Sequence, residues 1–181
     1  MSNNEFYTVN IAGVKRDLPV CPLNEHISIA GFVMFGDVEL TVHAAKELLA
    51  RVPEFDYILT PEAKSIPLAY EMSRQSNKKY FVARKKDKVY MKNPVRVKVK
   101  SITTNGEQTL ILDSADGEQI RGKRIVIVDD VISTGESLRA VEQLAEAFDC
   151  NVVAKTAVLA EGEAFTRKDI TVLGELPLIK N

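Results

Sequence analysis

Two adjacent acids and a group of hydroxyl and glycine residues lie close together in the last third of the chain. They belong to the segment Arg124-Ile-Val-Ile-Val-Asp129-Asp130-Val-Ile-Ser133-Thr134-Gly135-Glu136-Ser137. The apolar run before the acids predicts a strand, and the amphipathic pattern that begins at residue 136 predicts a helix. The start of a helix offers unpaired N–H groups and partial positive charge, and Gly135 allows the backbone to approach a ligand closely. The turn between strand and helix is therefore suited to a phosphate group.

The two acids suit a sugar or a metal ion. Asp129 and Asp130 can accept hydrogen bonds from sugar hydroxyls, or lie near Mg²⁺, which prefers oxygen ligands. Together with the turn, they indicate a site for a phosphorylated sugar. The structural alternative is that Ser133 and Glu136 form an S-x-x-E capping box and that the acids only begin a loop. The GxxxxGK[ST] pattern of a Walker loop and the GxGxxG pattern of a dinucleotide site are both absent from the sequence.

Positive charge is concentrated in a second segment. Eight basic residues lie between residues 84 and 100, with Asp87 as the only acid among them. Taken alone, such a run is typical of a solvated face or, less often, of a nucleic-acid patch. A third segment, Thr60-Pro61-Glu62-Ala63-Lys64-Ser65, places another cation after a predicted strand. The alternative for Lys64 is a loop cation that contacts only water.

Apolar patterns predict the elements that must position these residues. Helical periodicity predicts helices over residues 39–52, 66–74 and 136–148, and short apolar runs predict strands over residues 56–60, 79–84, 124–129 and 152–159. Alternation on both sides of Asn105-Gly106 predicts a hairpin of residues 95–102 and 108–113. Because βαβ crossovers place helices on both faces, this order predicts an α/β fold with a doubly wound, mostly parallel sheet. Ligands of such sheets bind beyond the carboxyl ends of the strands.

Length and composition exclude several classes of protein. The 181 residues are 45% hydrophobic and 27% charged, which favours one compact domain over a disordered chain. The formal net charge of −1 gives no global attraction to nucleic acid or to an anionic membrane. No apolar stretch approaches the ~20 residues needed to cross a bilayer, and no secretory signal is visible, so we expect a cytoplasmic protein. The two cysteines and two histidines do not have the spacing of a structural zinc site.

As a unit, the apolar strand, the acid pair and the Thr-Gly turn closely resemble the phosphoribosyl-pyrophosphate motif of type I phosphoribosyltransferases. The resemblance covers most of the chain, and among family members it is greatest to the adenine and xanthine enzymes. It implies a single domain over residues 1–181, with a small N-terminal hood over residues 1–37 and a core over residues 38–181 that includes a hairpin loop at about 90–113. By matching position, it implies that Asp129 and Asp130 hold the ribose and are the catalytic residues. It assigns the 5′-phosphate to Ser133, Thr134, Gly135, Glu136 and Ser137.

The same resemblance gives the two basic segments a role in binding pyrophosphate. In the adenine-type enzymes an Arg-Lys pair after the corresponding strand, with another lysine three residues on, contacts pyrophosphate. The matching residues are Arg84, Lys85 and Lys88. Lys64 lies in a second pyrophosphate loop, where adenine enzymes usually carry arginine, and it supplies a point charge without the bidentate fork.

A segment near the N-terminus resembles the part of the adenine enzymes that covers the base. The sequence Ala-Gly-Phe-Val-Met-Phe-Gly-Asp of residues 30–37 is similar to their Pro-Gly-Val-x-Phe-Arg-Asp stretch. It implies that Phe35 stacks on the base and that the backbone of Met34 contacts the edge of the base. Here Gly36 replaces the arginine of the family and one residue is inserted. The structural alternative is that residues 32–35 all pack into the core.

The largest departure from the family lies in the loop that closes over the reacting centre. Adenine enzymes carry a glutamate there, in a Ser-Leu-Glu-Tyr-like context, whereas this chain has Ser-Ile-Thr-Thr-Asn at residues 101–105. The nearest carboxylate in sequence is Glu107, which could substitute if the tip of the hairpin folds down. Glu136 is a smaller departure, because it replaces a glycine after the Thr-Gly pair.

These features predict a purine phosphoribosyltransferase of purine salvage. It would convert a purine base, adenine first, and phosphoribosyl pyrophosphate into the nucleoside monophosphate and pyrophosphate, with Mg²⁺ bound mainly through the substrate near Asp129 and Asp130. The resemblance also implies a homodimer, and neither nucleic acid nor a membrane is an expected partner. One alternative is a regulator that senses phosphoribosyl pyrophosphate and has lost catalysis, which the missing loop glutamate favours and the lack of a helix-turn-helix segment disfavours. Another is a transferase for a different nitrogen base.

Overall fold

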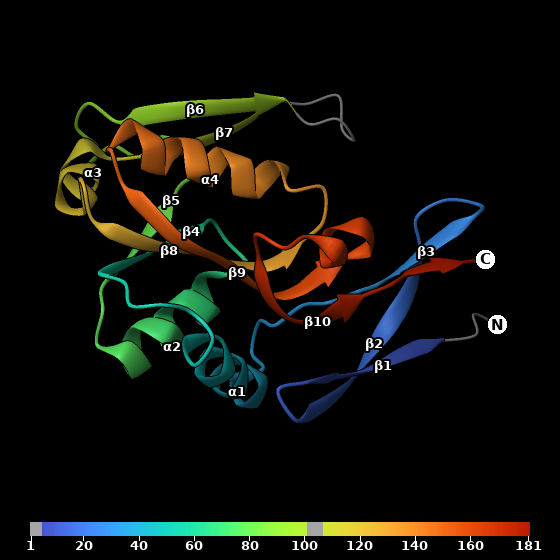
Figure 1. Cartoon of the computed structure of the whole chain (residues 1–181). Helices are drawn as coiled ribbons and strands as arrows, with labels where there is room; N and C mark the ends of the chain where they lie inside the picture. Colours follow the sequence, from blue (N-terminus) through green and yellow to red (C-terminus); the bar gives the residue numbers. More distant parts are fainter. Residues whose placement is uncertain (1–4, 101–106) are drawn as a thin grey trace.

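A computed structural model describes residues 5–100 and 107–181 of the chain (Figure 1). The elements follow one another in this order: β1 (Phe6–Ile11), β2 (Val14–Pro22), β3 (Ile27–Ala30), α1 (Val38–Leu49), β4 (Tyr57–Pro61), α2 (Ile66–Ser76), β5 (Tyr80–Ala83), β6 (Val95–Lys100), β7 (Glu107–Leu112), α3 (Ser114–Ile120), β8 (Arg124–Ile132), α4 (Glu136–Ala147), β9 (Asn151–Glu161), the 3-10 helix η1 (Gly162–Thr166), β10 (Thr171–Leu176) and β11 (Leu178–Lys180).

The centre of the molecule is a five-stranded parallel sheet with the strand order β10-β9-β8-β4-β5. Helices cover both faces of this sheet: α1 and α2 lie on one face, and α4 lies on the other beneath the β6–β7 hairpin (Figure 1). The predicted doubly wound α/β fold is therefore confirmed. Among the described residues, no helix is long and apolar enough to cross a membrane.

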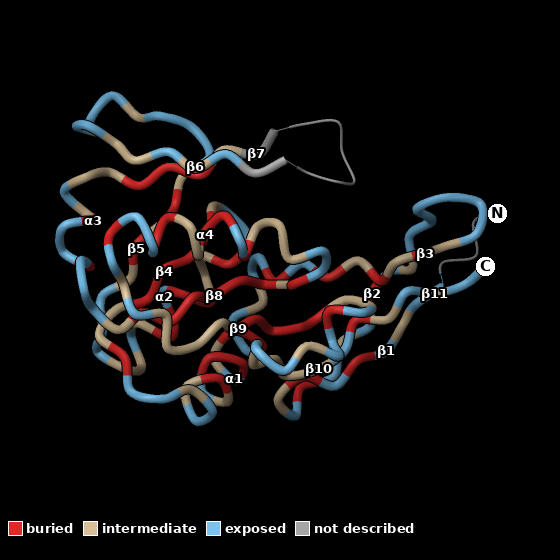
Figure 2. The backbone as a smooth tube through the Cα atoms, turned by 45° about the horizontal axis from the view of Figure 1, so that its top comes forward, coloured by how far each residue is buried: buried red, intermediate tan, exposed pale blue. Residues whose placement is uncertain are grey.

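Strand β8 is the middle strand of the sheet and is buried on both faces. Its side chains alternate between two apolar clusters, as successive residues of a strand must. Val126 and Val128 pack in the cluster that contains the apolar faces of α1 and α2, and Ile125 and Ile127 pack in the cluster that contains α4. The tube in Figure 2 shows the resulting band of buried backbone through the centre of the molecule. Burial on both faces explains why this strand has a continuous apolar sequence.

The predicted helices and strands of the core are present, with differences at their ends. The most consequential difference is that β8 continues to Ile132, whereas the sequence predicts that it ends at Asp129. The two acids therefore belong to the extended end of the central strand and not to a loop that follows it. The elements without a predicted counterpart are β1, β2, β3, α3, η1, β10 and β11.

A second, antiparallel sheet includes most of the segment that the resemblance assigns to the hood, and we call it the hood sheet. Its strand order is β1-β2-β3-β11, so three strands come from the N-terminal part of the chain and the fourth is its last strand. β11 pairs with β3 through Leu178–Ile29 and two further residue pairs. The C-terminus consequently lies beside β3, at the end of the molecule away from α3 (Figure 1).

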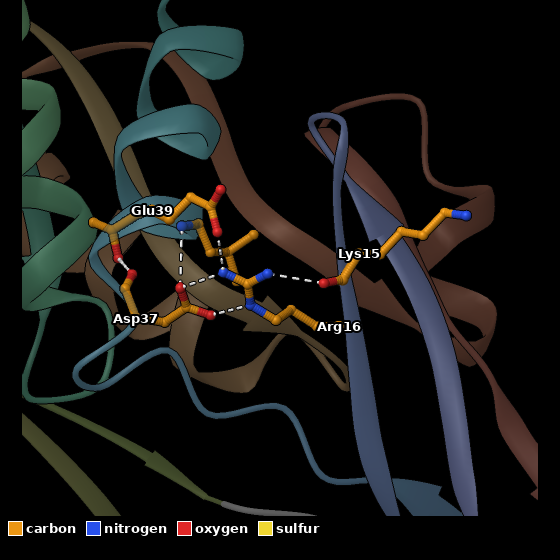
Figure 3. Close-up of polar contacts among 6 residues, drawn as sticks. Lys15, Arg16, Asp37 and Glu39 are labelled. Carbon is orange, nitrogen blue, oxygen red and sulfur yellow. Dashed lines mark hydrogen bonds and ion pairs between the residues drawn. The ribbon is translucent and has the colours of Figure 1, made fainter.

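One ion-pair cluster joins the hood to the core (Figure 3). Arg16 of β2 donates hydrogen bonds to both carboxylate oxygens of Asp37, at 2.6 and 2.8 Å, and to Glu39 at 2.8 Å. Asp37 is also the N-cap of α1, where its Oδ1 accepts a hydrogen bond from Leu40 N at 3.1 Å. The Arg16 guanidinium holds the pKa of Asp37 below its ordinary value, so the carboxylate stays charged. The Asp37 side chain thus fixes both the start of α1 and the position of the segment that leads into this helix.

The predicted β6–β7 hairpin is confirmed, and it packs against helix α4. Val95 and Val97 pack against the apolar cluster that contains α4. A pair of backbone hydrogen bonds between Arg84 and Ile111, at 2.7 and 2.8 Å, attaches β7 to the chain that leaves β5. The predicted Asn105-Gly106 turn and the 101–105 match to the family's glutamate loop lie outside the described residues. Glu107 is the first residue of β7, where its backbone pairs with Lys100.

Candidate functional site

The acid pair occupies the carboxyl end of the central strand and is almost completely buried. Asp129 is 7% exposed and Asp130 is 4% exposed. The backbone N–H of Asp130 donates a hydrogen bond of 2.9 Å to Asp129 Oδ1. Oδ2 of Asp130 is buried and makes no hydrogen bond to any described residue. A buried acceptor of this kind is uncommon, because unsatisfied polar groups cost stability, and it suits a donor supplied by a ligand.

Burial changes the protonation of the pair. Desolvation raises the pKa of Asp129 far above its ordinary value, and the nearby charge of Asp130 raises it further. The direction follows from physics, because a buried carboxylate loses its hydration and repels a like charge beside it. The acid pair therefore holds a proton more readily than two exposed aspartates would.

Lys64 is the cation next to this pair. It lies in the loop between β4 and α2, and its Nζ is 3.2 Å from Asp130 Oδ2, an ion pair without the angles of a hydrogen bond. Thr60 of β4 joins this loop to β8, because its hydroxyl lies 2.8 Å from the Val128 carbonyl oxygen and 2.8 Å from the Ser65 hydroxyl. A third acid, Glu161, lies at the end of β9. Burial raises the pKa of Glu161, and the charge of Lys64 offsets part of that rise. The alternative in which Lys64 contacts only water is wrong.

The predicted cations after β5 are linked to the same loop. Glu62 forms an ion pair of 3.2 Å with Arg84 Nε and accepts a hydrogen bond of 2.9 Å from the backbone of Lys85. The Lys85 bond, with the charges of Arg84 and Lys88, holds the pKa of Glu62 below its ordinary value. Glu62 therefore joins the basic segment after β5 to the loop that carries Lys64. The side chain of Lys85 is exposed and that of Lys88 is half-buried.

The 133–137 turn begins helix α4 without a side-chain cap. Gly135 is the N-cap, with a left-handed φ of 82° that favours glycine, and no side chain caps the helix start. The alternative of a capping box formed by Ser133 and Glu136 is therefore wrong: Ser133 lies two residues before the N-cap and is exposed. The N–H of Glu136 donates a long hydrogen bond of 3.5 Å to Thr134 Oγ1. The first N–H groups of a helix have no partner within the helix, so the N–H groups that follow can serve a ligand.

The segment predicted to contact the base alternates between buried and exposed side chains. Phe32 and Met34 are 6% and 1% exposed, whereas Val33 and Phe35 are 60% and 54% exposed. The alternative in which all four pack into the core is therefore wrong for Val33 and Phe35. Met34 also lines a pocket of about 430 Å³ between α1 and α2, to which neither the acid pair nor the cations contribute. Among the described residues, no hydrogen bond or ion pair joins Met34 or Phe35 to the acid pair.

The described residues do not make a metal site of their own. No group of three or more His, Cys, Asp or Glu side chains among them could hold a metal ion. Two carboxylates with one unbonded oxygen fit the manner in which Mg²⁺ binds in many phosphate sites, where one or two carboxylates assist and the substrate phosphates and water supply the other ligands.

The arrangement as a whole gathers opposite charges at one edge of the sheet. Acids lie at the carboxyl end of β8, cations follow β4 and β5, and an open helix start follows β8 directly. Of the predicted residues, the structure brings Asp129, Asp130 and Lys64 into one cluster and joins Arg84 and Lys85 to their loop. The sequence analysis did not single out Glu62 or Glu161. Such a site can bind a ligand that has hydroxyl groups at its centre and phosphate groups on two sides.

Urea unfolding at several pH values tests the burial of Asp129. Because the pKa of Asp129 is raised on folding, its contribution to the free energy of unfolding should be most favourable below the unfolded pKa of about 4 and should fall as the pH rises toward the folded pKa. Asp129→Asn removes the charge, so its free energy of unfolding in urea should exceed that of wild type by about 1–3 kcal/mol at pH 8, and the two should converge toward pH 4.

Asp56→Asn is the matched control, because Asp56 accepts hydrogen bonds from Arg124 at the other end of β8. Hydrogen bonds from Arg124 lower the pKa of Asp56 to about 2, so this variant should lose stability at pH 8. An Asp129→Asn protein that is less stable than wild type at pH 8 would show that the buried charge is compensated.

The chain is similar to several curated proteins. Residues 40–174 match the family model of the phosphoribosyl transferase domain. A hypoxanthine/guanine phosphoribosyltransferase of Methanothermobacter thermautotrophicus is 32% identical over 153 residues, which are 82% of this chain and 76% of that protein. One from Methanococcus voltae is 32% identical over 126 residues, 69% of this chain and 64% of its own length. The purine biosynthesis transcriptional repressor PurR of Bacillus subtilis is 32% identical over 110 residues, 61% of this chain but only 38% of the repressor.

The fold also has solved relatives. The crystal structure of adenine phosphoribosyltransferase from Thermoanaerobacter pseudethanolicus superposes with a TM-score of 0.71 at 20% identity, covering 87% of this chain and 95% of that one. At this identity the likeness concerns the fold, and it agrees with the parallel sheet and its helices. The family model covers most of the sheet and the whole segment from β4 to α4. By its sequence as well as its fold, this chain belongs to the phosphoribosyltransferase family.

Proposed function

We propose that the protein transfers the phosphoribosyl group of phosphoribosyl pyrophosphate to a purine base, with adenine as the first candidate. The observation that carries the proposal is the buried Asp129–Asp130 pair, which stands at the end of the central strand directly before an uncapped helix start and beside Lys64. A ribose with a phosphate on one side and a diphosphate on the other matches that order of groups. Family membership gives the reaction class, since curated relatives include purine phosphoribosyltransferases.

In the proposed complex, the acid pair holds the ribose. The unbonded Oδ2 of Asp130 supports this assignment, because a ribose hydroxyl would give it the donor that it lacks. The N–H groups and hydroxyls of Ser133, Thr134, Gly135, Glu136 and Ser137 would hold the 5′-phosphate. Fixing both ends of the sugar keeps C1′ in place, and such positioning can supply a large part of a rate enhancement.

The cations after β4 and β5 would hold the diphosphate. Lys64, Arg84, Lys85 and Lys88 offset the negative charge that grows on the leaving group as its bond to C1′ breaks. Mg²⁺ bound to the diphosphate, near Asp129 and Asp130, would neutralise further charge on the leaving group. Ion pairing with Glu62 supports the role of Arg84, since it directs the guanidinium toward the loop of Lys64.

The reaction itself exchanges one bond at C1′ for another. A nitrogen of the base forms a bond to C1′ and loses its proton, while the C1′–O bond breaks and its electron pair leaves with pyrophosphate. The transition state should have oxocarbenium character, as in other glycosyl transfers. The loop from Tyr90 to the hairpin would exclude water from this centre, and Phe35, exposed beside buried Met34, would stack on the base.

A regulator that binds phosphoribosyl pyrophosphate without turning it over is the second candidate. The similarity to the repressor PurR and the lack of the family's loop glutamate both favour it. It needs the same residues for the ribose and the phosphates. The two candidates therefore differ in turnover and not in binding.

Pyrophosphate release tests the reaction. We expect release from phosphoribosyl pyrophosphate and Mg²⁺ with one purine when adenine, hypoxanthine, guanine, xanthine, uracil and orotate are supplied separately. Asp130→Asn should lower kcat/KM by at least about 100-fold, which is typical of a lost charged contact in the transition state, without unfolding the protein. Asp149→Asn, an exposed aspartate that pairs with Arg121, is the control and should keep wild-type turnover.

Three results would decide between the candidates. Full activity of Asp130→Asn would contradict the assignment of the acid pair. Turnover with uracil or orotate alone would make the protein a transferase for another base. No turnover with any base, together with a rise in melting temperature when phosphoribosyl pyrophosphate is added, would establish the regulator.

Phe35→Ala tests the site of the base. Loss of one base–aromatic stack should raise KM for the base by about tenfold and leave KM for phosphoribosyl pyrophosphate unchanged. Val33→Ala is the matched control, because Val33 is equally exposed two residues away. Equal effects of the two substitutions would remove Phe35 from the site.

We also propose, from the resemblance, that the protein is a homodimer. Sedimentation velocity of the purified chain should give twice the mass of 20.1 kDa. A single species of the monomer mass at micromolar concentration would contradict this proposal.

A further inference from the structure

Arg167 lies against the turn that begins helix α4, although it is far from that turn in sequence. It follows the 3-10 helix η1, after the end of β9. A Cβ added to Gly135 would lie 2.7 Å from Nη1 of Arg167, so the guanidinium fills the space that a side chain would need. Gly135 therefore serves two purposes: its φ of 82° favours glycine, and its missing side chain admits Arg167 to the backbone of the turn.

The guanidinium is held in a fixed orientation by Asp169. Arg167 donates from Nε to Oδ1 of Asp169 at 2.9 Å and from Nη2 to Oδ2 at 2.8 Å. The same Oδ2 accepts a hydrogen bond of 2.7 Å from Lys155, and Lys155 donates another, of 2.8 Å, to Glu142 of α4. A two-point contact between arginine and carboxylate fixes the plane of the guanidinium. The network therefore ties Arg167 to β9 and to the very helix that begins at the turn.

This orientation leaves Nη1 of Arg167 directed at the turn. Asp169 takes Nε and Nη2, and Nη1 donates no hydrogen bond to any other described residue. The side chain is 32% exposed, so solvent and ligands can reach it. Arg167 and Lys155 hold the pKa of Asp169 well below its ordinary range, which keeps the anchor charged at any pH of interest.

The turn itself needs a cation if it is to bind a phosphate. Among residues 133–137 the only charged side chain is Glu136, which is negative. A phosphate monoester carries about −1.5 to −2 charges at neutral pH, whereas a helix start contributes only about +0.5. No side chain of the segment itself adds positive charge. A fixed positive charge in contact with the turn would supply what the segment lacks.

We propose that Arg167 is a ligand-binding residue that supplies this charge to the phosphate monoester held by the 133–137 turn. The inference rests on the proposed function, because it assumes that the turn binds the 5′-phosphate. It adds a residue outside the motif, on a segment that follows β9. It also gives Lys155 and Asp169 a positioning role behind Arg167.

Binding measurements with two separate ligands test this role. Ribose 5-phosphate and pyrophosphate are titrated calorimetrically into the full chain, wild type and Arg167→Gln. Loss of a charged hydrogen bond should weaken ribose 5-phosphate binding by about tenfold or more, while pyrophosphate binding stays within about twofold of wild type. Arg121→Gln is the matched control, because Arg121 forms the same kind of fork with Glu118 and also contacts Asp149, and it should bind both ligands as wild type does.

Asp169→Asn tests the positioning of the guanidinium. It weakens the two-point contact that fixes the plane of Arg167, so ribose 5-phosphate binding should weaken several-fold while pyrophosphate binding stays within about twofold of wild type. This variant keeps the inference falsifiable even if Arg167→Gln does not fold. Melting temperatures of all variants separate binding from stability.

The outcomes distinguish this inference from the proposed function. If wild type binds no ribose 5-phosphate, the assignment of the turn fails and the inference fails with it. If wild type binds it and Arg167→Gln binds it equally well, only the role of Arg167 is refuted. Equal weakening of both ligands would mean that Arg167 has a structural role, and this result would also overturn the inference. Unchanged binding of ribose 5-phosphate by Asp169→Asn would refute the positioning role of Asp169.

Discussion

The cost of burying two adjacent carboxylates at the end of the central strand determines how the surrounding elements are arranged. Asp129 and Asp130 cannot turn toward water, because β8 has a strand on each side and helices on both faces. Their charges must be met by groups that other elements bring to the same edge of the sheet. Lys64, from the loop after β4, is such a group, and within β8 itself the backbone N–H of Asp130 bonds to Asp129.

The loops at this edge hold one another in place through buried or half-buried polar contacts. The Thr60 hydroxyl anchors the β4–α2 loop to the Val128 carbonyl oxygen, one residue before the acid pair. Glu62 extends the same loop to Arg84 and the backbone of Lys85. Arg84 in turn pairs through its backbone with Ile111 of β7. A ligand that displaced one of these groups would therefore affect the loop after β4, the loop after β5 and the hairpin together.

The sequence predicts most of the core because its periodicity and its burial agree. β8 and α4 follow from an apolar run and an amphipathic face that the structure buries as expected. The sequence does not predict that β11 completes the hood sheet, because a three-residue strand has no pattern of its own and its partner β3 is about 150 residues away. The end of β8 was also predicted too early, since a pair of acids inside a strand conflicts with ordinary strand composition.

The site is predictable where its residues are consecutive and not where they meet only in space. Asp129, Asp130 and the turn form one segment, so a local pattern reveals them. Glu161 and Arg167 stand among ordinary surface residues, and only the packing of β9 and η1 beside β8 and α4 brings them to the site. The capping-box interpretation failed for a related reason: the left-handed Gly135 moves the start of the helix two residues past Ser133.

The contact between Lys64 and Asp130 also explains how a buried acid pair can be both stable and available to a ligand. In the folded protein Lys64 lowers the cost of the Asp130 charge without using up its oxygen in a hydrogen bond. In the proposed complex a ribose hydroxyl would bind that oxygen and a phosphate would bind Lys64, so each partner of the ion pair would receive a new contact at the same time. Neither charge would be left buried alone, which is the arrangement that costs most. A ligand with only the hydroxyls, or only the phosphates, would satisfy one side of the pair and leave the other as it was. The geometry therefore favours a ligand that carries both, with the two kinds of group a few ångströms apart.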